Sequence, residues 1–133
     1  MNRSTTRAAL AALALALATA TALPAHAHGD DHSHAPLHGG VVTEAGDMDY
    51  ELVAQSERIT LHLRDHGKPA KTEGASARLT LLSGSDKTEA TLTPAAAGTL
   101  EAKGQFKVAP GTKVLALVTL PGKKAANVRF AVK

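Results

Sequence analysis

From Val41 onward, most of the chain consists of short runs in which hydrophobic and polar residues alternate. In the run 58–64, for example, Ile59, Leu61 and Leu63 fall on one side of an extended strand and polar residues on the other. Turns rich in Gly, Pro, Asp and Ser separate such runs at intervals of about ten residues. The pattern predicts strands at 48–54, 58–64, 77–82, 87–93, 99–103, 114–120 and 127–132. We therefore expect an all-β fold, a small antiparallel β-sandwich of about seven strands.

The run 48–54 assigns opposite faces to two kinds of residue. Alternation places Met48, Tyr50 and Leu52 on the core side, and Asp49 and Glu51 on the other. We expect the two carboxylates to lie on a solvated strand face, which argues against a glycosidase-like acid pair. For Met48, core packing is expected, and a thioether ligand for Cu(I) is the alternative.

The N-terminus has the composition of a cleaved leader. Arg3 and Arg7 precede an apolar or small-residue run at 8–23, and Ala25-His26-Ala27 has the small-x-small pattern that signal peptidase recognises. The run is about 16 residues long, short of the roughly 20 that a membrane span needs. We predict a signal peptide at 1–27, export to the periplasm by the general secretory route, and no membrane span after cleavage.

Composition excludes several classes of function for the remaining chain. Basic residues are scattered, and Trp is absent, whereas nucleic-acid binding needs a concentrated basic face and usually aromatic stacking platforms. The chain also has no cysteine, no Gly-x-Ser-x-Gly elbow and no Gly-rich phosphate loop. We expect no nucleic-acid partner and no enzymatic activity in the domain at 41–133.

Residues 28–40 have no hydrophobic periodicity and are predicted to form a flexible, His-rich arm. Four of the seven histidines of the chain lie between positions 28 and 38. After cleavage, His28 would offer an α-amine and an imidazole to one Cu(II) ion, and His32 and His34 would add imidazoles. A His-rich tract outside the cytoplasm favours metal binding, and a solvated tail without specific function is the alternative.

A second group of histidines, His38, His62 and His66, lies within or beside the predicted domain. His38 precedes Gly39-Gly40, where the backbone can bend sharply and bring the imidazole against the domain. His62 is expected to be a solvated strand residue, whereas His66 lies in the following turn, about 13 Å further along an extended chain. The predicted metal ligands, for a copper or zinc ion, are His28, His32, His34, His38 and His66.

Three motifs in this region resemble a known family. His38-Gly39-Gly40 is followed by the Tyr-Glu-Leu-Val run at 50–53 and then by a strand that ends near Gly67-Lys68-Pro69. This order resembles the small periplasmic His-Gly-Gly domain associated with heavy-metal efflux systems of the resistance-nodulation-division class, in its stand-alone exported form. His66 is an addition to the Asp-Gly-Lys-Pro-like turn of that family. The resemblance implies a metal-linked role for His38, with Glu51 as a further candidate, and a periplasmic efflux component as partner.

These observations lead to one expected function and its alternatives. We expect a non-enzymatic periplasmic metal-binding accessory protein that buffers or delivers copper or zinc in heavy-metal resistance and efflux. The alternative is a non-catalytic β-sandwich interaction module of an envelope complex, docking through a sheet edge, with an incidental His-rich tail. A copper enzyme of histidine-brace type is a third interpretation, but the sequence shows no evident substrate surface for it.

Overall fold

The computed structural model describes residues 34–133, so the predicted signal peptide, His28 and His32 lie outside the described residues. The regular structure of this part is entirely β, which confirms the predicted all-β class. None of the described residues belongs to a helix long and apolar enough to cross a membrane. The strands are β1 (Val41–Ala45), β2 (Met48–Ala54), β3 (Arg58–Asp65), β4 (Lys68–Pro69), β5 (Ser76–Ser83), β6 (Asp86–Pro94), β7 (Thr99–Lys103), β8 (Lys113–Thr119) and β9 (Ala126–Ala131).

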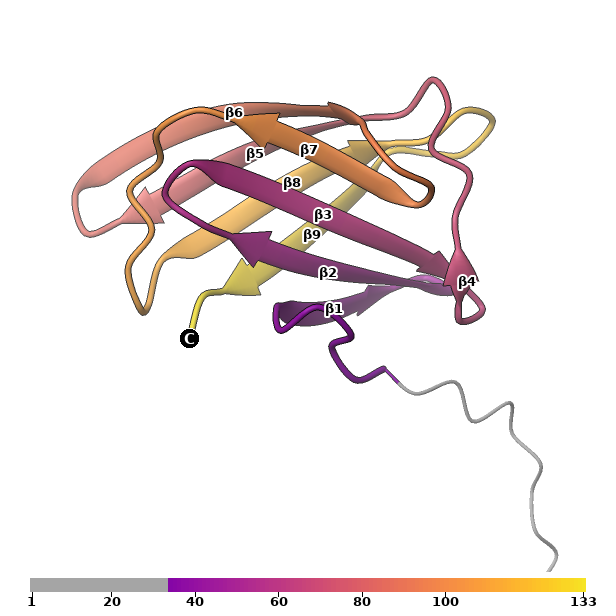
Figure 1. Cartoon of the computed structure of the whole chain (residues 1–133), viewed down its shortest axis with the longest axis horizontal. Coiled ribbons are helices and arrows are strands. Elements are labelled where there is room, and N and C mark those ends of the chain that lie inside the picture. The colour runs from indigo at the N-terminus through magenta and orange to yellow at the C-terminus, as the bar shows by residue number, and fades with distance from the viewer. Residues whose placement is uncertain (1–33) are drawn as a thin grey trace, which may run out of the picture.

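The nine strands form one antiparallel sheet that curls into a nearly closed barrel (Figure 1). The strand order is β1-β2-β3-β7-β6-β5-β8-β9, and β4 pairs with β3. The first and last strands of this path lie beside each other, and the Thr43 hydroxyl donates a hydrogen bond to the Arg129 carbonyl at 2.8 Å. Within the described residues no backbone ladder joins β1 to β9, so the barrel has an open seam there.

The antiparallel arrangement is confirmed, but the strands number nine rather than about seven. All seven predicted runs form strands, and the two additions are the short strands β1 and β4. A sandwich of two separate sheets was predicted, but its two layers are joined into one sheet. The connection is made by β6, which pairs with a strand of each layer. Its first residues pair with β5, whereas Thr93 and Pro94 at its end pair with β7.

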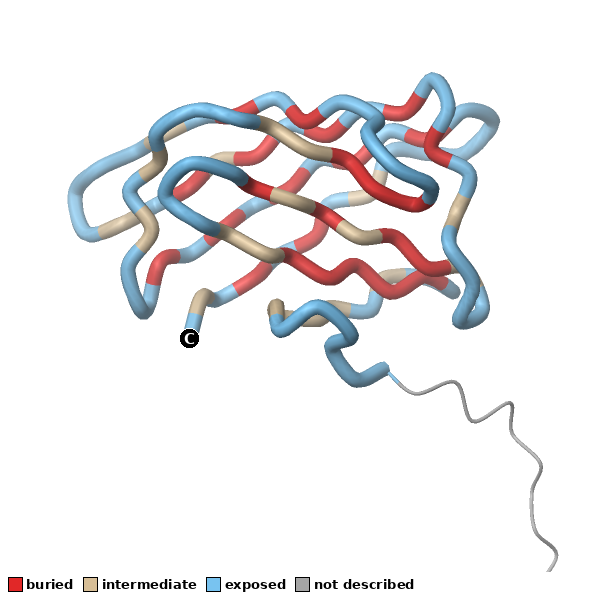
Figure 2. The backbone as a smooth tube through the Cα atoms, in the orientation of Figure 1, coloured by how far each residue is buried: buried red, intermediate tan, exposed pale blue. Residues whose placement is uncertain are grey.

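The core lies between the two layers and is built from the inward half of each alternating strand (Figure 2). Ile59, Leu61 and Leu63 are at most 1% exposed, as their spacing predicts. Met48, Tyr50 and Leu52 are also buried, which confirms their predicted parity. Burying one such large apolar side chain contributes about 1.5–3 kcal/mol, so aliphatic packing holds the barrel together without disulfides.

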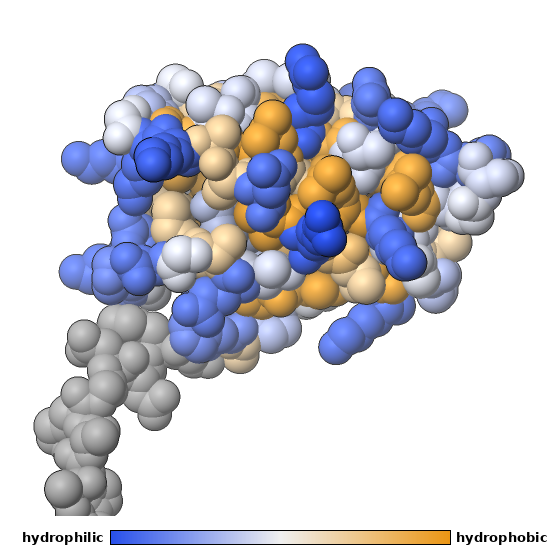
Figure 3. Space-filling view, turned by 180° about the vertical axis from the view of Figure 1, so that it is seen from behind, coloured by the Kyte–Doolittle hydropathy of each residue, from blue (hydrophilic) through white to orange (hydrophobic). Residues whose placement is uncertain are grey.

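The outer face of β5 and β8 is less polar than a fully solvated sheet face. Leu82, Leu115 and Leu117 are 44%, 40% and 40% exposed there. Figure 3 shows apolar side chains interspersed with hydrophilic ones on this side of the molecule. Strand pairing places Leu117 beside Arg78 and Leu115 beside Arg129, so the apolar groups lie among cations.

Candidate metal centre

Residues 34–40, called the N-terminal strap below, lie against the sheet at β2. Alternation along β2 points Asp49 and Glu51 away from the core and toward this strap. Both side chains were expected to be solvated, but they are only 5% and 0% exposed. That expectation is wrong because the periodicity of a strand identifies its outer face but cannot reveal which other segment covers it.

Glu51 anchors the strap through four hydrogen-bond contacts. The backbone N–H groups of Leu37, His38 and Gly40 donate to its carboxylate at 3.0, 2.7 and 3.0 Å. The Nδ1 atom of His38 lies 3.0 Å from Oε2 of the same carboxylate. Burial by itself would raise the pKa of Glu51, but the His38 side chain and the three backbone donors outweigh it and lower the pKa to about 2. Glu51 is therefore a buried, charged acceptor that holds the strap in place.

The two glycines after His38 make this close approach possible. Gly39 has φ = 73°, a left-handed conformation that other residues adopt at a cost. At Gly40, an added Cβ would lie 2.4 Å from the carbonyl oxygen of Leu52 on β2. The predicted bend at Gly39-Gly40, which brings the His38 imidazole against the domain, is confirmed.

His38 stacks on His62, whose side chain projects from β3. The two rings are parallel within 2°, and their centroids are 3.6 Å apart. His62 is half-buried, and burial first and the neighbouring His38 second lower its pKa. The expectation of a solvated His62 is therefore wrong, because the strap covers it. Nitrogen lone pairs lie in the ring plane, so two parallel stacked rings cannot both direct one at the same ion in this arrangement.

His34 belongs to a second cluster, which has the arrangement of a metal site. Its Nδ1 atom is 2.7 Å from Oδ1 of Asp49, and its Nε2 atom is 3.9 Å from Oε2 of Glu44. Ligand atoms of these three residues all lie within 4.8 Å of one another, and the described residues hold one group of this kind. The hydrogen bond to Asp49 and the charge of that carboxylate raise the pKa of His34. His34 and Glu44 are exposed, so an ion could enter from solvent.

Arg64 compensates the buried charge of Asp49. Its Nη2 atom lies 3.7 Å from Oδ2 of Asp49 and donates to the Ala35 carbonyl at 3.2 Å. Both charged side chains are nearly inaccessible to solvent. Arg64 thus links the strap to β2, and one oxygen of Asp49 remains directed at His34.

The distances around His34 fit metal ligation through Nε2. If Nδ1–H donates to Asp49, Nε2 carries the lone pair, an arrangement typical of metal-binding histidines. Zinc–ligand bonds of about 2.0–2.1 Å place two ligands of a tetrahedral ion roughly 3.3 Å apart. The observed separation of Nε2 from the Glu44 oxygen, 3.9 Å, requires only a small movement of an exposed side chain. His34 and Glu44 would then be two ligands, and Asp49 would orient the imidazole.

The predicted ligands that the structure describes, His34, His38 and His66, lie at three separate positions rather than around one site. His34 lies with Glu44 and Asp49, and His38 lies with Glu51 and His62. His66 lies beyond the end of β3 and contacts Asp65 instead. The predicted ligands His28 and His32 fall outside the described residues.

Sequence reasoning missed Glu44 and Asp49 as members of the His34 site. The two residues face each other across the β1–β2 hairpin, which turns at Gly46. The signal for this pairing was the short run 41–45 before the turn Gly46-Asp47. Had that run been assigned as a strand, the hairpin would have placed Glu44 opposite Asp49.

Comparison with known proteins gives no relative from which a function could be taken. No protein-family model, curated protein or solved structure matches this chain. What the site can bind is therefore inferred from its own donor atoms.

Proposed function

We propose that this chain is a periplasmic, non-enzymatic accessory protein that binds copper or zinc and buffers or delivers the ion in heavy-metal resistance and efflux. One observation carries the proposal: His34 lies in a group with Glu44 and Asp49 whose potential ligand atoms are all within 4.8 Å of one another, with its Nε2 facing Glu44 and its Nδ1 facing Asp49. His34, the first member of this cluster, directly follows residues 28–33, which contain His28 and His32. Export after cleavage at Ala27 would place His28 at the start of the same metal-binding segment.

The donor atoms suit borderline metal ions. Imidazole nitrogen binds zinc, copper and nickel well, and among divalent ions copper(II) binds such sites most strongly. A tetrahedral zinc ion needs four ligands, so two more would join His34 and Glu44. His28 and His32, from the preceding segment, are the donors that the sequence offers. Because His34 and Glu44 are exposed, the ion can exchange, as buffering or delivery requires.

Mild acid would release the ion from this site. A protonated imidazole cannot bind metal, and the pKa of His34 is raised above 6.5 by the hydrogen bond and charge of Asp49. The proton therefore competes with the metal at a higher pH than it would at an isolated histidine. The pH of the compartment becomes a control on occupancy.

Calorimetric titration with Zn(II) and Cu(II) tests this function in the chain from His28 to Lys133. We expect one ion per chain and a loss of affinity of about tenfold or more in Glu44→Gln and in His34→Ala. Glu89→Gln is the matched control, because Glu89 is an exposed strand glutamate on β6. Equal metal affinity of the parent chain and the three variants would refute the site. Absence of metal binding by the parent chain would refute the function.

A second candidate function, docking on an envelope partner, is favoured by the exposed face of β5 and β8. The half-exposed leucines Leu115 and Leu117 lie there beside Arg129 and Arg78. The two functions are distinguished by deleting this chain from a strain, expressing a variant in its place, and measuring the metal resistance of that strain. Failure of Glu44→Gln to restore resistance supports metal binding, whereas failure of a Leu115→Ser, Leu117→Ser double variant with normal metal affinity supports docking.

A further inference from the structure

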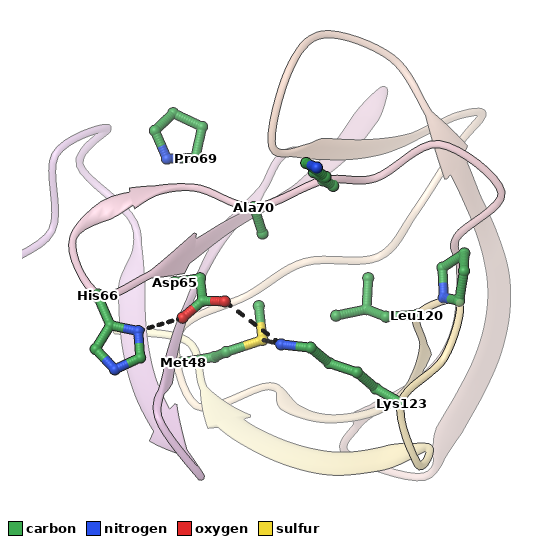
Figure 4. Close-up of a pocket in the computed structure, with 9 residues that line it drawn as sticks. Met48, Asp65, His66, Pro69, Ala70, Leu120 and Lys123 are labelled. Carbon is green, nitrogen blue, oxygen red and sulfur yellow. Dashed lines mark hydrogen bonds and ion pairs between the residues drawn. The ribbon is translucent and has the colours of Figure 1, made fainter.

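A pocket of about 400 Å³ lies at the mouth of the barrel, between the β3–β4 turn and the loop after β8 (Figure 4). Its wall is apolar and includes Met48, Ala70 and Leu120. Its rim carries Asp65, His66, Lys71 and Lys123. Ligand pockets of proteins commonly occur at the mouths of β-barrels, with apolar walls and a few polar groups. This pocket combines the same features.

The polar groups of the rim are organised around Asp65. Its carboxylate accepts a hydrogen bond from Nδ1 of His66 and lies 3.4 Å from Nζ of Lys123. Figure 4 shows Asp65 between these two side chains, with the Met48 sulfur beside the ammonium group at 3.9 Å. The ammonium group of Lys123 is thus held between the Asp65 carboxylate and Met48 of the apolar wall.

The β3–β4 turn adopts an uncommon backbone conformation at this rim. Among the described residues other than glycine, His66 is the one with a positive φ, 49°, and Gly67 follows with φ = 78°. Two consecutive positive φ values are typical of a type I′ hairpin turn, where Asn-Gly is the usual sequence. A histidine in this place positions its imidazole on Asp65. Unfavourable conformations that a fold retains often mark functional sites.

The net charge of the pocket is positive. Lys71 and Lys123 contribute two positive charges against one negative charge from Asp65, and Lys71 has no ion-pair partner among the described residues. We propose that this pocket binds a small organic carboxylate. Its apolar body would lie against Met48, Ala70 and Leu120, and its carboxylate would lie between the ammonium groups of Lys123 and Lys71. The site is separate from the His34 cluster, so it stands whether or not that cluster binds metal.

Amide NMR spectra of the 15N-labelled chain from His28 to Lys133, titrated with hexanoate and with hexanamide, test the proposal. The two probes have the same chain and differ in charge. We expect hexanoate to shift the signals of residues 65–71 and 120–123, with a dissociation constant on the order of 1 mM. Hexanamide should bind at least about tenfold more weakly, because it lacks the charge-assisted contact.

Two variants locate the carboxylate contact. Lys123→Met should weaken hexanoate binding about tenfold, and the amide spectrum itself verifies that the variant folds. Lys87→Met is the control, since Lys87 is likewise an exposed lysine beside a carboxylate, 3.7 Å from Glu89. The proposal is overturned if neither probe shifts the pocket signals, if both probes bind equally, or if Lys123→Met leaves the hexanoate affinity unchanged.

Discussion

Replacing Glu51 with glutamine should release the N-terminal strap from the barrel. The carboxylate accepts hydrogen bonds from three backbone N–H groups and pairs with the His38 imidazole, while being 0% exposed. An amide has only one oxygen. If that oxygen keeps the N–H groups of His38 and Gly40, the NH2 group faces the N–H of Leu37. A buried donor would then be left without an acceptor, which costs about 1–3 kcal/mol.

The pKa of Glu51 gives a second measure of the same contribution. The pKa falls from 4.5 to about 2 in the folded protein. At about 1.4 kcal/mol per pKa unit, this lowering corresponds to about 3–4 kcal/mol of stability from the ionised form. Because the folded pKa is lowered, this stabilisation is complete above the unfolded pKa and is lost as the pH falls toward the folded one. It should shrink to about 1 kcal/mol near pH 3.

Urea unfolding of the chain from His28 to Lys133 measures this effect. At about pH 7, Glu51→Gln should unfold with about 3 kcal/mol less free energy than the parent chain, and the gap should narrow to about 1 kcal/mol near pH 3. The control Glu89→Gln, at an exposed site, should stay within about 0.5 kcal/mol of the parent. A gap below about 1 kcal/mol at neutral pH, or one that does not change with pH, would refute the role given to Glu51.

Three further predictions concern the strap, the core and the His34 site. Gly40→Ala should lower the free energy of unfolding by about 1–3 kcal/mol, because its Cβ would lie 2.4 Å from the Leu52 carbonyl oxygen; unchanged urea stability would show that the strap does not pack there. Leu61→Ala, at a position 0% exposed, should cost about 2–5 kcal/mol in the same assay, and a cost under about 1 kcal/mol would contradict the assigned core. Asp49→Asn should return the raised pKa of His34 toward 6.5 in an NMR titration, and an unmoved pKa would rule out Asp49 as its cause.

The alternating pattern was sufficient to predict the β-class and the core. Ile59, Leu61 and Leu63 are buried because a strand with one apolar face is stable only when that face is covered. The same pattern could not show that β6 joins the two layers, since strand partners far apart in sequence leave no local signal. The two-residue strand β4 was missed because it is too short to show any period.

Only the histidines of the candidate site were predictable from the sequence, and their carboxylate partners were not. The clustering of histidines identified His34 and His38, but their carboxylate partners Asp49 and Glu51 follow 15 and 13 residues later. On an ordinary solvated strand those carboxylates would have had no special role. Their burial depends on the strap folding back at Gly39 and Gly40, and this tertiary contact cannot be read from strand periodicity.

The metal site at His34 is tested most directly by zinc titration of the chain from His28 to Lys133 with 15N-labelled histidine, followed through the imidazole nitrogen signals. The geometry predicts that Nε2 of His34 takes the shift of a metal-bound nitrogen while Nδ1 keeps its proton toward Asp49. Signals of His66, which contacts Asp65 instead, should remain unchanged. A response of His66 or His62 with His34 unaffected, or no response at any histidine, would contradict the proposed site.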